Sequence, residues 1–62
     1  MSMNWAQAHD KAEKQSKRER IDVYIMRSLE EGMFVSTEKK ANATLIGTYR
    51  NGRYIPADSQ AD

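Results

Sequence analysis

Cysteine is absent from the 62 residues, and His9 is the only histidine. Disulfides and cysteine-containing metal centres, which stabilise many chains of this length, are therefore excluded. No apolar run approaches the roughly 18 residues that a membrane span requires. The residues up to Trp5 include neither the basic nor the apolar segment of a secretory signal. We therefore expect a cytoplasmic protein that has no membrane partner.

The sequence also lacks a large excess of either charge, because it contains ten Lys and Arg residues and nine Asp and Glu residues. The net charge of +1 argues against a protein whose whole surface is basic and binds a polyanion. The chain has no thiol, and His9 reads as a solvated helix residue, so the sequence offers no nucleophile with an adjacent base. It contains no calcium-binding loop and no glycine-rich phosphate loop. We predict a protein that is not an enzyme and holds no cofactor or metal.

Residues 3–31 contain no glycine or proline and are rich in strong helix formers. Two apolar stripes at helical spacing run along this segment, on different faces of an ideal helix. They consist of Trp5, Ala8 and Ala12, and of Ile21, Ile25 and Leu29. Either one long helix contacts different neighbours, or a polar helix over residues 1–18, ordered by a partner, precedes a core helix over residues 20–31. Gly32 supplies the C-terminal stop in both cases.

The residues after Gly32 are typical of strands. Residues 33–37 are short and β-favouring, and residues 43–50 are a run of β-formers that ends at Asn51-Gly52. An Asn-Gly pair between such segments predicts a hairpin with a type I′ turn. This turn aligns Arg50 with Arg53, Tyr49 with Tyr54, Thr48 with Ile55 and Gly47 with Pro56. Pro56 ends the last strand, and we expect residues 57–62 to form a flexible acidic tail.

These elements predict a single α+β domain over residues 1–62. A long or broken N-terminal helix packs on a small antiparallel β-meander that ends in the Asn-Gly hairpin. One hairpin face carries Leu45, Tyr49 and Tyr54 and has no charge; the other carries Ile46, Thr48, Ile55 and two arginines. We expect the tyrosine face to pack under the helix over residues 20–31, with the opposite face as the alternative.

An interaction surface at the hairpin tip is the leading functional hypothesis. Facing arginines repel each other, and residues that oppose folding are concentrated at functional sites. Arginine and tyrosine are common hot-spot residues, and Trp5 on a polar helix is either an anchor for a partner or part of the protein's own core. The predicted partner-binding residues are Arg50, Arg53, Tyr49, Tyr54 and Trp5. We therefore predict a small interaction module that inhibits or regulates a larger protein, with an acidic target suiting the arginines.

Two other functions stay open. A basic helix stripe together with the hairpin arginines would suit a phosphate backbone, which makes nucleic-acid binding the alternative. Its candidate residues are Lys11, Lys14, Lys17, Arg18, Arg20, Arg50 and Arg53. A solvated helix face, supported by a Glu13–Lys17 pair, explains the same lysines without any ligand. The third function is a structural homodimer with paired N-terminal helices. The size and composition are typical of short accessory proteins of phages and mobile elements.

Overall fold

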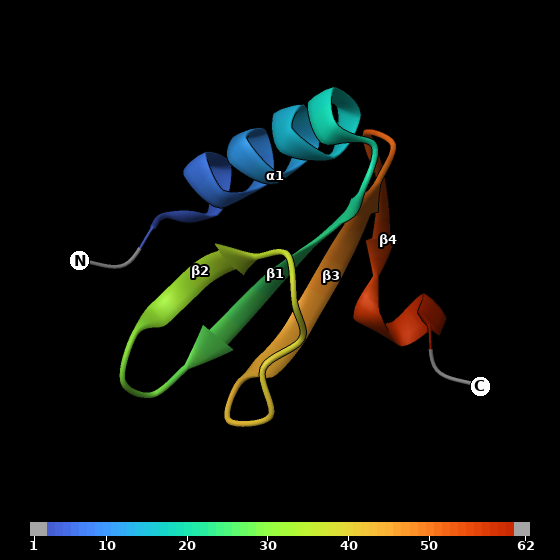
Figure 1. The fold of residues 1–62 in the computed structure, drawn as a ribbon. Coiled ribbons are helices and arrows are strands. Elements are labelled where there is room, and N and C mark those ends of the chain that lie inside the picture. Colours follow the sequence, from blue (N-terminus) through green and yellow to red (C-terminus); the bar gives the residue numbers. More distant parts are fainter. Residues whose placement is uncertain (1–2, 61–62) are drawn as a thin grey trace.

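One α-helix crosses one face of a four-stranded antiparallel sheet in the computed structural model, which describes residues 3–60 (Figure 1). The helix α1 spans Trp5–Glu19, and the strands are β1 (Asp22–Ser28), β2 (Gly32–Ser36), β3 (Thr44–Arg50) and β4 (Arg53–Pro56). The strand order is β2-β1-β3-β4. The predicted α+β class is thus confirmed. The sheet is not a simple meander, because the chain passes from β2 across the sheet before β3 pairs with β1.

Helix α1 begins with a capping box. The Asn4 side chain accepts a hydrogen bond from the Gln7 amide at 2.8 Å, and the Gln7 side chain accepts one from the Asn4 amide at 3.2 Å. These bonds satisfy two amides at the start of the helix that have no partner within it. The sheet-facing stripe of α1 is fully buried and consists of Ala8, Ala12 and Ser16. Small side chains at this spacing let the helix lie close to the strands of its own chain.

The predicted core helix over residues 20–31 is wrong, because most of this segment is strand β1 and the turn into β2. Val23 and Ile25 pack against α1, whereas Met26 is buried outside that cluster. The Lys40 amide donates to the Met26 sulfur at 3.5 Å, which places the connection from β2 to β3 over the other face of the sheet. A central strand that is covered on both faces lacks polar alternation, so its apolar residues can match helical spacing.

The turns of the sheet depend on backbone positions with positive φ. Gly32 has the predicted left-handed conformation (φ 71°), but it closes the β1–β2 turn and does not end a helix. Asn51 and Gly52 both have positive φ, 54° and 82°, as a type I′ turn requires. The pairing of β3 with β4 follows the register expected for a two-residue loop, from Arg50 opposite Arg53 to Gly47 opposite Pro56.

The tyrosine face of the hairpin packs under a helix, as predicted, but the helix is α1. A β-bulge changes which residues share this face. Ile25 pairs with Gly47 and Met26 with Leu45, so Ile46 is the extra residue between them. Ile46 packs against the buried cluster beneath α1, whereas Leu45 is the partner of Met26. The predicted assignment of Leu45 to the tyrosine face and of Ile46 to the opposite face is therefore wrong.

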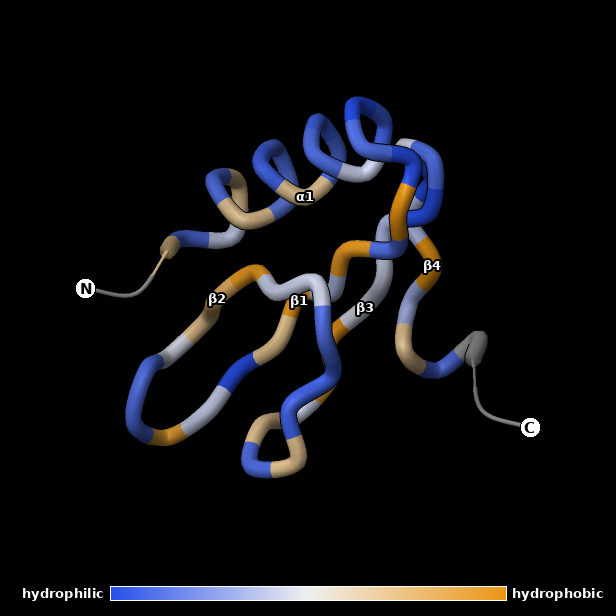
Figure 2. Tube along the Cα trace, viewed as in Figure 1, coloured by the Kyte–Doolittle hydropathy of each residue, from blue (hydrophilic) through white to orange (hydrophobic). Residues whose placement is uncertain are grey.

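Hydrophobic residues gather in the strands, while α1 and the hairpin tip are mainly hydrophilic (Figure 2). No helix in the described part of the chain combines the length and apolar character needed to cross a membrane. The 3-10 helix η1 (Ala57–Gln60) occupies the first part of the predicted tail. Residues 61–62 lie outside the described residues, and the flexibility of the tail stays a prediction.

Candidate interaction site

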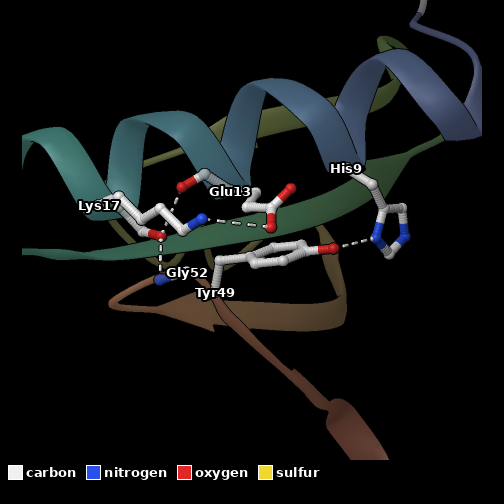
Figure 3. A network of polar contacts seen from close by, with 6 residues as sticks. His9, Glu13, Lys17, Tyr49 and Gly52 are labelled. Atoms are coloured by element: carbon white, nitrogen blue, oxygen red, sulfur yellow. Dashed lines mark hydrogen bonds and ion pairs between the residues drawn. The ribbon is translucent and has the colours of Figure 1, made fainter.

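The C-terminal part of α1 and the β3–β4 turn lie side by side (Figures 1 and 3). The Ser16 hydroxyl connects them, because it donates to the Glu13 carbonyl at 3.0 Å and accepts from the Gly52 amide at 2.9 Å. The stem of Lys17 covers Gly52 so closely that a Cβ atom at Gly52 would lie 2.3 Å from Lys17 Cε. The fold thus brings together the two basic segments that the sequence keeps apart.

We call the surface formed by Arg20, Ile21, Arg50 and Arg53 the arginine-rich end. All four residues are exposed, and Ile21 keeps 37% of its surface accessible. Two shallow hollows meet at Arg50: one also contains Arg20 and Ile21, and the other contains Arg53. The arginine-rich end therefore places the exposed aliphatic side chain of Ile21 in the same hollow as Arg20 and Arg50, with Arg53 in the adjoining hollow.

Arg50, which lies opposite Arg53 in the hairpin, forms an ion pair with Asp22. Its Nε and Nη2 atoms donate to the two carboxylate oxygens of Asp22, each at 3.0 Å. This fork of hydrogen bonds lowers the pKa of Asp22 and raises the pKa of Arg50. The predicted repulsion at the hairpin tip is thereby offset across the β1–β3 pair. Among the described side chains, Arg20 and Arg53 have no ion-pair partner and are the available guanidinium groups of this end.

The two tyrosines of the predicted partner surface lie toward the interior. Tyr49 is 9% exposed beneath α1, and its hydroxyl lies 2.8 Å from Nδ1 of His9 (Figure 3). Burial is the main cause that raises the pKa of Tyr49. Tyr54 is half-buried, covers Gly47 with its ring and donates a hydrogen bond to the Ile46 carbonyl at 3.4 Å. Tyr49 therefore contributes to the core in this fold.

The interpretation of His9 as a solvated residue is wrong, since its ring lies among three aromatic rings. The ring centroids of Trp5, Tyr54 and Tyr49 are 4.2, 4.8 and 5.5 Å from that of His9. The Nε2 atom of His9 is buried and has no hydrogen-bond partner among the described residues. Burial lowers the pKa of His9. Trp5 stacks on this cluster and remains 56% exposed.

The predicted partner-binding residues do not form one patch. Trp5 begins the 15-residue helix, whereas Arg50 and Arg53 lie beside its other end. At the rise of an α-helix, about 20 Å separates the two ends. The structure therefore places the hairpin arginines on one surface and Trp5 on another.

The basic stripe of the nucleic-acid hypothesis is mixed with acidic side chains. Lys14 is 3.2 Å from Asp10, Lys17 is 3.8 Å from Glu13, and Arg18 is 3.2 Å from Glu19. The predicted Glu13–Lys17 support pair is present. Of the five basic residues proposed along this segment, Lys11 and Arg20 alone have no ion pair among the described side chains. Exposed pairs of this kind add little to stability, but they lower the positive potential of the helix.

Sequence reasoning missed the two polar contacts that organise this region, His9–Tyr49 and Ser16–Gly52. The available signal was the stripe of small residues at positions 8, 12 and 16, which indicates close helix packing. No group of three or more potential metal-ligating side chains occurs within the described residues. No protein-family model matches the chain, and no curated protein or solved structure shows significant similarity to it.

Proposed function

We propose that this protein is a small non-enzymatic interaction module that inhibits or regulates a larger protein by binding an acidic surface on it through the arginine-rich end. The main support is the position of Arg20 and Arg53, two exposed guanidinium groups without ion pairs among the described residues, in the same region as exposed Ile21. Guanidinium groups bind carboxylates through two parallel hydrogen bonds. Arginine beside exposed apolar surface is typical of protein interfaces.

The same region is less suited to a phosphate backbone. Asp22 pairs with Arg50 of this surface, and Glu13 and Glu19 pair with the neighbouring Lys17 and Arg18. The carbonyl end of α1 also carries a partial negative charge. A nucleic-acid surface usually shows a stronger basic excess along one face. Ile21 also has no role in contacting phosphates. Binding of nucleic acid is therefore the second candidate.

Site-specific photo-cross-linking in the native host tests the proposal. A photo-reactive amino acid replaces Ile21, and in a control protein it replaces exposed Glu38 on the β2–β3 connection. We expect an adduct with a partner protein from position 21 and none from position 38. Mass spectrometry identifies the partner, and acidic residues are expected around its cross-linked site.

Charge-reversal variants test whether partner binding requires the arginine-rich end itself or only the positive charge of the protein as a whole. Arg20→Glu with Arg53→Glu is expected to abolish the position-21 adduct, whereas Lys14→Glu with Lys40→Glu, the same change in net charge elsewhere, retains it. Far-UV circular dichroism should be the same for both proteins. An adduct that survives the double arginine reversal would contradict the proposal.

A salt titration with labelled duplex DNA and RNA tests the second candidate. Phosphate contacts release counterions, so affinity that falls steeply between about 50 and about 200 mM salt would favour nucleic-acid binding over the protein partner. We expect weak binding at the lower salt concentration and the same weak binding after Arg20→Glu with Arg53→Glu.

A further inference from the structure

We infer that the outer edge of β2 binds an extended peptide segment of a partner protein, which adds to the sheet as a further strand beside α1. This surface is separate from the arginine-rich end, because β2 and the β3–β4 hairpin lie on opposite sides of β1 (Figure 1). We call it the β2 groove. Its walls include Met3 and Lys11 on one side and Glu31, Met33 and Val35 on the other.

The outer edge of β2 has backbone amide and carbonyl groups that can form hydrogen bonds with an added strand. β2 is the outer strand of the sheet, and β1 is the one strand that pairs with it among the described residues. The Met33 carbonyl accepts a hydrogen bond from the Met3 amide at 3.3 Å, so the backbone amide and carbonyl of Met33 point away from β1. Because the direction of these groups alternates along a strand, the backbone amide and carbonyl of Val35 also point away from β1. The Val35 amide and carbonyl and the Met33 amide are therefore directed at an incoming strand.

The arm before α1 already shows that this edge accepts extended backbone from outside the sheet. Met3 forms one ladder-like hydrogen bond to Met33 and packs against the core beneath α1. The opposite edge is less suitable, because β4 is short and ends at Pro56, which has no amide hydrogen. An added strand thus fits the β2 side, where it would extend the pairing that Met3 begins.

The side chains of the β2 groove indicate the chemistry of the peptide. The groove is an open hollow of about 570 Å³ between α1 and β2. Met33 and Val35 are half-buried and present apolar surface to it. Lys11 is exposed, and no acidic side chain lies within 4.0 Å of its ammonium group among the described residues. Within the described chain, Lys11 is the one cationic side chain in a lining that also contains Glu30 and Glu31. We therefore assign the groove to a peptide in which β-branched residues surround a single Asp or Glu, and this acidic residue pairs with Lys11.

Selection of phage-displayed random short peptides against the intact protein tests this inference. We expect enriched sequences with alternating β-branched residues and one acidic position. On Lys11→Glu the enriched sequences should carry Lys or Arg at that position. Lys14→Glu is the matched control on the same helix but outside the groove, and it should select the wild-type sequences.

A synthetic copy of an enriched peptide then distinguishes strand addition from side-chain docking. Methylation of the peptide amides that face β2 should weaken binding about tenfold, the effect of one lost hydrogen bond, whereas methylation of the alternate amides should leave affinity unchanged. The peptide should also shift the amide resonances of Met33 and Val35. Arg20→Glu with Arg53→Glu should bind it normally, so this result does not depend on the proposed function.

Three outcomes would overturn the inference. They are a selection that enriches no peptide above the unselected library, a peptide that tolerates methylation at every amide, and enriched sequences that Lys11→Glu leaves unchanged. Resonance shifts confined to the arginine-rich end would assign the peptide to that surface and would equally exclude the β2 groove.

Discussion

At the scale of single residues, His9 is the clearest case of a side chain whose environment is set by the fold. It stands between Ala8 and Asp10 in a polar helix, yet its ring contacts both tyrosines of the β3–β4 hairpin. Nδ1 has the Tyr49 hydroxyl as its partner, and Nε2 is buried without a partner in the described part of the chain. A charge on the imidazole would be poorly solvated there, which favours the neutral ring.

Stability should therefore fall as the pH drops from about 7 to about 5. Burial lowers the pKa of folded His9 below its ordinary value near 6.5, so the unfolded chain binds the proton more readily. The contribution of neutral His9 is fully present above the unfolded pKa and is lost as the pH falls toward the folded pKa. Melting temperatures measured at both pH values should differ more for the wild type than for His9→Gln.

The Asp22–Arg50 pair does not contribute to the change in melting temperature between pH 7 and pH 5. The pKa of Asp22 is lowered, so its stabilising effect is present above the ordinary carboxyl range and is lost only at more acidic pH. Asp22→Asn should therefore show the same change in melting temperature between pH 7 and pH 5 as the wild type. An equal change in His9→Gln would show that another group is responsible.

Gly47→Ala should destabilise the protein by about 1–3 kcal/mol, the usual effect of overpacking. A Cβ atom at Gly47 would lie 2.4 Å from the Tyr54 ring, which covers this position. Urea denaturation of Gly47→Ala, Tyr54→Leu and the double variant measures the coupling. The penalty of Gly47→Ala should shrink when Tyr54 is replaced. An undiminished penalty would locate the strain in the backbone and not in the ring contact.

At the scale of secondary-structure elements, the hairpin could be predicted from the sequence and β1 could not. The β3–β4 turn depends on two adjacent residues, Asn51 and Gly52, whose positive φ angles are a local property. The identity of β1 depends on α1 and on the β2–β3 connection, which cover its two faces and remove polar alternation. Ile21, Ile25 and Leu29 matched a helical stripe by spacing, but only Ile25 is buried.

The bulge at Ile46 is a second feature that local sequence patterns could not predict. Strict alternation along β3 places Leu45 with the tyrosines, whereas one inserted residue moves Ile46 there instead. The candidate site shows the same limit. Both basic segments could be recognised separately, but only the contact between Ser16 and Gly52 brings them together.

Ser16→Ala should cost about 1–3 kcal/mol because it leaves the partly buried Gly52 amide without its acceptor. Helix propensity opposes this loss, since alanine is the best helix former. Chemical denaturation provides the measurement, and Gln15→Ala, next to it on the helix, is the control and should be neutral or slightly stabilising. A Ser16→Ala protein as stable as Gln15→Ala would mean that the helix and hairpin do not depend on this bond.

At the scale of the whole molecule, one buried cluster joins the helix to the sheet. Ala8 and Ala12 of α1 pack with Val23 and Ile25 of β1 and with Tyr49 of β3. A two-layer domain of this size has no second core from which the sheet could draw stability. The helix and the sheet are therefore expected to unfold as one cooperative unit.

Ala12→Asp should abolish the fold of the sheet as well as that of the helix. The new carboxylate would be buried among apolar side chains without a partner, at a cost of several kcal/mol. The total stability of a small domain is only about 5–15 kcal/mol. Ala6→Asp is the matched control, because Ala6 is exposed in the first turn of α1, where an acidic side chain is favourable. Amide spectra should collapse for Ala12→Asp and stay dispersed for Ala6→Asp. Retained β-strand resonances in Ala12→Asp, with only α1 lost, would show that the four strands fold without the helix, and the single cooperative core would then be refuted.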